Sequence, residues 1–172
     1  MQKTIIKNGL ISAGILLGVN LVTFLLLGTD PDNYEIGEII GYATIVGCMA
    51  MVFIGMREYE MMYEKLSFTK KIGIGSGIAL CPSLAFGLYN VIYYKWMDPD
   101  FMESYYTLSL KQMEETMSPE EFQIAKAQAL EQMAMFESLW FQFILMFLTV
   151  FVIGLIVSLL SAMYLQIRPV RK

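Results

Sequence analysis

Four long apolar stretches, each uncharged through its centre, constrain the fold of this chain more than any other feature. They cover about residues 5–28, 36–56, 72–96 and 139–166. A helix needs about 20 apolar residues to cross a hydrocarbon core of about 30 Å, and each stretch is long enough. We therefore predict an all-α polytopic membrane protein with four transmembrane helices, forming a single membrane domain over residues 1–172.

Composition supports a lipid bilayer as the solvent. Apolar residues make up 56% of the chain and charged residues 16%, whereas about a quarter of a soluble domain is charged. The net charge of −4, with no strongly basic face, excludes nucleic acid as an expected partner.

The first stretch is predicted to be a retained signal-anchor helix rather than a cleaved signal peptide. A signal peptide has an apolar region of roughly 7–15 residues followed by a small-residue cleavage site. The stretch here is longer, and the segment from Leu25 to Asp30 contains no A-x-A pattern.

The distribution of Lys and Arg predicts the orientation. Nine of the twelve basic residues lie in the N-terminus, the 57–71 segment and the C-terminus, and the other three are Lys95, Lys111 and Lys126. Because basic flanks stay in the cytoplasm, we expect both termini on the cytoplasmic side of a bacterial inner membrane. Trp96 and Trp140 fall at the opposite boundary, where amphipathic rings belong.

Residues 98–138 are predicted to form an outer amphipathic helical hairpin between the third and fourth membrane helices. Asp98-Pro99 is typical of a helix start, and Ser118 and Glu121 have the spacing of a capping box. The second arm of the hairpin is expected to continue without a break into the fourth membrane helix. One apolar face is expected to run along it, through Phe122, Ala125, Ala129, Met133, Phe136 and Trp140. A looser stripe on the first arm comprises Met102, Tyr106, Met113 and Met117.

Two Asp-Pro-Asp segments, at residues 30–32 and 98–100, follow the first and third apolar stretches. Independent helix caps explain them more simply than a duplicated two-helix unit, because Asp-Pro is common at helix starts.

Several segments together resemble a family of uncharacterised small bacterial four-helix inner-membrane proteins, classed as a domain of unknown function. The matching segments are residues 64–71, 97–101 and 154–162, together with the acidic, Met- and Gln-rich hairpin. The pair Arg57-Glu58 also fits this pattern, whereas the arms of the hairpin are somewhat short. The resemblance implies four membrane helices, and it supplies no established activity and no catalytic residues.

Small residues spaced by four occur in every predicted membrane helix. Such faces let helix backbones approach closely, either within this bundle or against a membrane-protein partner or a second copy. The third helix has two faces, which places it centrally in the bundle or at an oligomer contact. The faces are Gly14 and Gly18; Gly37 and Gly41; Gly73, Gly77 and Cys81; Gly75, Ala79, Ser83 and Gly87; and Gly154, Ser158 and Ala162.

Pro82, midway along the third stretch, is expected to free the carbonyl of Ile78 and to kink the helix. A broken helix of this kind can line a transport site. Ionisable residues usually mark ion and proton paths, and none lies at this depth. The polar candidates are Asn20, Ser76, Ser83, Asn90 and Gln142, and a packing role is favoured, with hydrogen bonds between helices from Asn20 and Asn90.

Metal and catalytic chemistry have little support in the sequence. Adjacent carboxylates such as Glu114-Glu115 and Glu120-Glu121 point about 100° apart on a helix, which favours a solvated acidic face over a calcium site. The fourteen methionines suit Cu(I) in principle, but they lie at helix-face spacing, which favours packing. Cys48 and Cys81 are expected to be small packing residues. We predict no enzyme, no cofactor, no metal and no catalytic residues.

The leading hypothesis from the sequence is a non-catalytic accessory or scaffolding subunit of a membrane complex, with the outer hairpin as its docking element. A small transporter or channel acting as an oligomer is the alternative, suggested by Pro82, Ser83 and Asn90. A methionine-dependent copper-binding protein is a third class.

Overall fold

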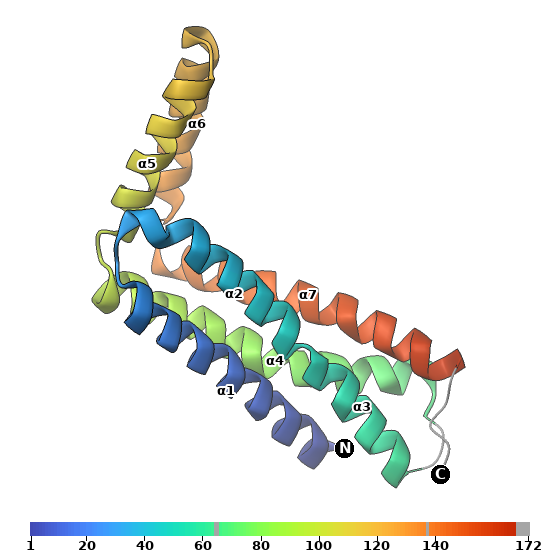
Figure 1. Cartoon of the computed structure of the whole chain (residues 1–172). Coiled ribbons are helices and arrows are strands. Elements are labelled where there is room, and N and C mark those ends of the chain that lie inside the picture. Colours follow the sequence, from blue (N-terminus) through green and yellow to red (C-terminus); the bar gives the residue numbers. More distant parts are fainter. Residues whose placement is uncertain (64–65, 137, 168–172) are drawn as a thin grey trace.

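The structure is a computed structural model that describes residues 1–63, 66–136 and 138–167 (Figure 1). Four helical segments in these residues are long and apolar enough to cross a membrane, so the chain has the architecture of an all-α membrane protein. The first is α1 (Gln2–Leu27), the third is α4 (Phe68–Ile92) with a π-helical extension η2 (Tyr93–Met97), and the fourth is α7 (Leu139–Ile167). The second is built from a short 3₁₀ turn η1 (Pro31–Asn33), α2 (Tyr34–Cys48) and α3 (Ala50–Met62).

The second segment is longer than the sequence predicted, because its charged end stays helical. The predicted stretch ends at residue 56, where Arg57 and Glu58 begin a polar run, but α3 continues to Met62. Glu58 pairs with Lys7 of α1, with 2.6 Å between Nζ and Oε1, and Glu60 pairs with Lys71 of α4 at 2.9 Å. The two ion pairs therefore connect the charged end of α3 to α1 and α4.

Helix α4 is central in the bundle. It packs most extensively on α7 and next on α1. Its face of Gly75, Ala79, Ser83 and Gly87 meets α7: a Cβ on Gly154 would collide with that of Ala79, and one on Gly75 with Ser158. The small-residue faces predicted on α4 and on α7 therefore pack against each other inside the bundle, as expected for close helix approach.

The second face of α4 packs against α1. A Cβ on Gly9 would lie 2.7 Å from the Cys81 sulfur, and one on Gly77 would lie 3.1 Å from Ile5. Cys81 is therefore a small packing residue, as predicted, and Cys48 is buried in the core. In contrast, Gly14 and Gly18 have open space where a Cβ would be.

Pro82 lies within α4, which continues as a helix on both sides of it. The side chain is fully buried. The hydroxyl of the next residue, Ser83, donates a hydrogen bond to the carbonyl of Ala79 at 2.7 Å. Pro82 therefore does not divide α4 into two separate helices.

Two further helices, α5 (Phe101–Thr116) and α6 (Pro119–Phe136), contact each other and project from one end of the bundle (Figure 1). We call residues 101–136 the α5–α6 arm, and the end of the bundle from which it projects the arm end. The predicted capping box is present: the Ser118 hydroxyl donates to the Glu121 carboxylate at 2.7 Å, and the Glu121 amide donates back to Ser118 Oγ.

The predicted helix start at Asp98-Pro99 is wrong. Helix α5 begins at Phe101, and the Asp98 carboxylate accepts a hydrogen bond from the Tyr93 hydroxyl instead of capping amides. The other Asp-Pro-Asp segment does form a cap, because Asp30 Oδ1 accepts from the Asp32 amide. The two segments therefore differ locally.

The expected continuous helix from α6 into α7 is also wrong, because the chain turns sharply between them (Figure 1). The Ser138 hydroxyl accepts from the Phe141 amide, as a helix N-cap does. The Gln142 side chain donates to the carbonyl of Phe136 at the end of α6. These polar groups compensate the free backbone groups of the break, and of the predicted apolar face Trp140 is the member that becomes largely exposed.

Candidate functional site

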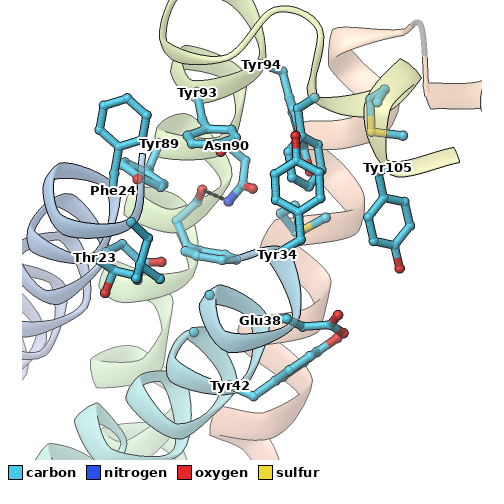
Figure 2. Close-up of a pocket in the computed structure, with 18 of the residues that line it drawn as sticks. Thr23, Phe24, Tyr34, Glu38, Tyr42, Tyr89, Asn90, Tyr93, Tyr94 and Tyr105 are labelled. Carbon is cyan, nitrogen blue, oxygen red and sulfur yellow. Dashed lines mark hydrogen bonds between the residues drawn. The ribbon is translucent and has the colours of Figure 1, made fainter. Parts of the chain in front are cut away.

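A cavity of about 440 Å³ lies at the arm end of the bundle, among α1, α2, α4 and α7 (Figure 2). Residues at the start of α5 form part of its wall, so the arm and the membrane helices share this site. The volume falls in the range of about 300–1,000 Å³ that is usual for small-ligand sites.

The cavity exists because α2 stands away from α4 and α7. Helix α2 packs mainly on α1 and touches α7 only lightly. Gly37 and Gly41 line the cavity, and a Cβ on either residue would meet no neighbouring atom. The predicted packing face of Gly37 and Gly41 is therefore not a helix contact, since its missing side chains leave the space open.

Aromatic rings dominate the walls. Tyr93 forms an edge-to-face pair with Phe24 of α1 and another with Phe101 of α5, at centroid distances of 5.8 and 5.6 Å. Tyr34 of α2 packs against Phe101 at 4.8 Å. These pairs connect residues from α1, α2, η2 and α5 into one aromatic rim. The lining tyrosines are Tyr34, Tyr42, Tyr89, Tyr93, Tyr94, Tyr105 and Tyr106.

Three asparagines present hydrogen-bond acceptors to the cavity. The side-chain nitrogens of Asn20, Asn33 and Asn90 donate to the carbonyls of Leu16, Leu27 and Phe86 at 2.8, 3.0 and 2.9 Å. A carbonyl can only accept, so the amide nitrogen must face it and the amide oxygen is left for other donors. Asn20 and Asn90 thus bond within their own helices, and the predicted hydrogen bonds between helices from these two residues are wrong.

The cavity has negative character. Glu38 of α2 lines it beside Tyr42 (Figure 2), and none of the described residues in its wall is Lys or Arg. Asp98 is buried behind the rim, with its carboxylate 3.2 Å from the Tyr93 hydroxyl. Burial raises the pKa of Asp98, while the hydrogen bond from Tyr93 acts in the opposite direction.

The structure brings only two of the polar candidates from the sequence, Asn20 and Asn90, to the cavity. Ser83 and Gln142 are buried elsewhere in hydrogen bonds to backbone carbonyls, and Ser76 does not line it. Glu38 and the tyrosines were not predicted as site residues from the sequence. Their signal was the concentration of Tyr and Phe at the helix ends, which also fits an ordinary interfacial belt.

The carboxylates considered for metal binding do not converge. Glu114, Glu115, Glu120 and Glu121 are all exposed, and Glu121 is engaged with Ser118. Among the described residues, no group of three or more Cys, Asp or Glu side chains is placed to hold a metal ion. Of the methionines, Met102 and Met146 line the cavity, and Met49 and Met56 are buried in the core.

Comparison with known proteins gives a family and no activity. A family model described as a protein of unknown function (DUF4199) matches residues 7–166, which is nearly the whole chain. The chain therefore belongs to this family, in agreement with the resemblance to a domain of unknown function. No curated protein matches it. No solved structure matches it either.

Proposed function

We propose that this protein is a non-catalytic accessory subunit of a complex in the bacterial cytoplasmic membrane, and that the α5–α6 arm is an extracytoplasmic helical hairpin that docks on a partner. The proposed orientation has both termini in the cytoplasm. Two observations support it: nine of the twelve basic residues lie in the predicted cytoplasmic segments, and α1 begins and α7 ends at the end of the bundle opposite the arm (Figure 1).

The observation that carries the docking proposal is the absence of a core in the arm. Within the described residues, α5 buries no residue and α6 buries only Ala129. A pair of helices normally needs a shared apolar core to hold its position, and this pair has almost none. The arm instead exposes Met117, Ile124, Leu130 and Met135, which are 41–64% accessible.

Charge defines the partner that would fit. Residues 98–138 contain nine acids and two lysines, a net charge of −7 (2 − 9). Apolar side chains surrounded by acidic ones fit a protein surface with an apolar centre and a basic rim. We therefore propose a protein partner with such a surface on the outer side of the membrane.

The test replaces exposed apolar side chains of α6 by charged ones in the full-length protein. The double variant Ile124→Glu with Leu130→Glu places two acids among the exposed apolar side chains of α6. The matched control is Gln123→Glu with Gln128→Glu, at exposed polar positions of the same helix. After gentle extraction from native membranes, native mass spectrometry measures the mass of the intact particle. We expect the Ile124/Leu130 variant to lose a stoichiometric partner and the control variant to keep it.

Two outcomes would contradict this proposal. One is a partner retained at full stoichiometry by the Ile124/Leu130 variant and by a protein in which residues 99–136 are replaced by a short linker. The other is a wild-type particle that contains only this chain.

The cavity favours a second candidate function, a small transporter or channel that acts as an oligomer. A tyrosine-lined space among membrane helices is a common position for a transported ligand. Four helices seldom enclose a pore alone, so this function requires self-association. A protein that is strictly monomeric in nanodiscs and inactive in liposome flux assays would exclude it.

A further inference from the structure

We propose that the cavity at the arm end binds an ammonium group carried on an apolar body, with Glu38 as its counter-charge. This inference does not depend on the docking of the arm, because the cavity walls lie mainly on α1, α2, α4 and α7. The ligand would enter from the lipid phase along the glycine face of α2, where Gly37 and Gly41 leave space.

Charge is the first argument. Glu38 is the acid in the lining, and no described lining residue is Lys or Arg. Asp98 adds a second carboxylate behind Tyr93, at 3.2 Å from that hydroxyl. Glu38 is exposed at the edge of the cavity, and two carboxylates without a basic neighbour in the wall attract a cation and repel an anion.

Hydrogen bonding is the second argument. The side-chain nitrogens of Asn20, Asn33 and Asn90 each donate one hydrogen bond to a backbone carbonyl, and the Thr149 hydroxyl donates to the carbonyl of Leu145. The hydroxyl of Tyr93 is likewise used, on Asp98. The asparagine side-chain oxygens and the Glu38 carboxylate are therefore available to accept from the N–H donors of an ammonium group.

The aromatic walls supply the third argument. Rings of Tyr34, Tyr93 and Phe101 form a connected rim, and the faces of such rings attract ammonium groups by cation–π interaction. The same rings give an apolar surface to the body of the ligand. A neutral apolar molecule would contact the aromatic rings but would not donate hydrogen bonds to the acceptors in the wall. An anion would be repelled by the carboxylates of Glu38 and Asp98.

Two sources have this chemistry: a free lipophilic amine and the headgroup of an ethanolamine phospholipid. Both place an ammonium group at the end of an apolar body. The experiment distinguishes them by the composition of the bilayer.

The test measures binding of three probes that share one ring system and differ in charge. These are 1-naphthylmethylammonium, 1-naphthylmethanol and 1-naphthoate. Full-length protein is placed in nanodiscs of phosphatidylglycerol, which has no ammonium group, and equilibrium dialysis against empty nanodiscs subtracts partition into lipid. We expect saturable binding of one ammonium probe per chain, at least about tenfold tighter than the alcohol, with no saturable binding of the carboxylate.

Variants connect this binding to the cavity. Glu38→Gln should weaken the ammonium probe about tenfold and remove its advantage over the alcohol, and Gly41→Leu should abolish binding by filling the space. Gly14→Leu is the matched control, because Gly14 also has open space around it but lies outside the cavity wall. Glu38→Gln is nearly isosteric, so it tests the site even if Gly41→Leu does not fold.

Replacing part of the lipid by phosphatidylethanolamine separates the two sources. Competition with the probe assigns the site to the lipid headgroup, and unchanged probe affinity assigns it to a free amine. The proposal is overturned if the alcohol or the carboxylate binds as tightly as the ammonium probe. It is also overturned if neither Glu38→Gln nor Gly41→Leu weakens binding.

Discussion

Glu60 of α3 and Lys71 of α4 form an ion pair of 2.9 Å, and both side chains are almost completely buried, with exposed fractions of 3% and 0%. Lys71 Nζ also donates to the side-chain oxygen of Gln166 on α7 at 3.4 Å. One buried pair thus ties three membrane segments together at the end of the bundle opposite the arm. The pair mainly fixes the relative positions of these segments. Its net contribution to stability is small, because the free-energy cost of removing both charges from water offsets much of their electrostatic attraction.

Removing one member of the Glu60–Lys71 pair is expected to destabilise the fold far more than removing both. Lys71→Met leaves a buried carboxylate without its partner and should cost about 3–5 kcal/mol. The double variant Lys71→Met with Glu60→Met should recover most of this loss. Unfolding in mixed micelles measures the free energy for both single variants and the double variant. Additive losses in this cycle would show that the two side chains are not coupled.

Substitution of Gly154 tests the close contact between α4 and α7. Gly154→Leu places a side chain against Ala79, where even a Cβ would collide, so we expect a loss of about 1–3 kcal/mol or more. Gly14→Leu is the matched control, because its Cβ meets open space. Thermal unfolding in nanodiscs should show a lower midpoint for Gly154→Leu alone. Equal midpoints for the two variants would contradict the packing described for this contact.

The capping box at the start of α6 should make this helix sensitive to acid. Hydrogen bonds from the Ser118 hydroxyl and backbone amide to the Glu121 carboxylate hold the pKa of Glu121 below its usual value. Because the folded pKa is the lower one, the stabilisation is complete above the ordinary pKa and is lost as the pH falls through the folded value. Hydrogen exchange of the first turns of α6, corrected for the intrinsic rate, measures this.

Removal of the cap supplies the comparison for that pH dependence. Ser118→Ala should destabilise the start of α6 by about 1 kcal/mol at neutral pH and reduce its acid sensitivity. Ser109→Ala, on the neighbouring helix α5 and outside any cap, serves as the control. An unchanged exchange rate in Ser118→Ala would argue against the capping box.

Asp98 should show the opposite pH dependence. Burial raises the pKa of this carboxyl, so the folded protein binds the proton more tightly than the unfolded chain does. Stability is therefore highest below the unfolded pKa and falls as the pH rises through the folded value. Asp98→Asn should stabilise the protein at neutral pH and have little effect in acid. A destabilised Asp98→Asn at neutral pH would contradict this assignment.

The hydrogen bond from Tyr93 can be tested on the same carboxyl. This bond favours the ionised form, so Tyr93→Phe should raise the pKa of Asp98 further. Carbon-13 NMR of protein labelled at aspartate follows four carboxyl signals, from Asp30, Asp32, Asp98 and Asp100. Only the Asp98 signal should move substantially, and an unchanged titration curve would show that the hydrogen bond is not formed in the membrane.

The features that depend on local chemistry could be predicted from the sequence. Long uncharged stretches must become helices in a bilayer, because every backbone group has to be paired within its own segment. The Ser118–Glu121 box and the two small-residue faces of α4 were equally readable, since they depend on the spacing of residues within one helix.

Features that depend on contacts between helices could not be predicted in this way. Glu58 and Glu60 of α3 pair with Lys7 of α1 and Lys71 of α4, which lie far from them in the sequence. Gly37 and Gly41 look like a packing face in the sequence, yet they border a cavity because α2 leans on α1 and away from α7. No local pattern specifies such long-range partners, so the buried ion pair and the tyrosine-lined cavity emerge only when the four membrane segments are assembled.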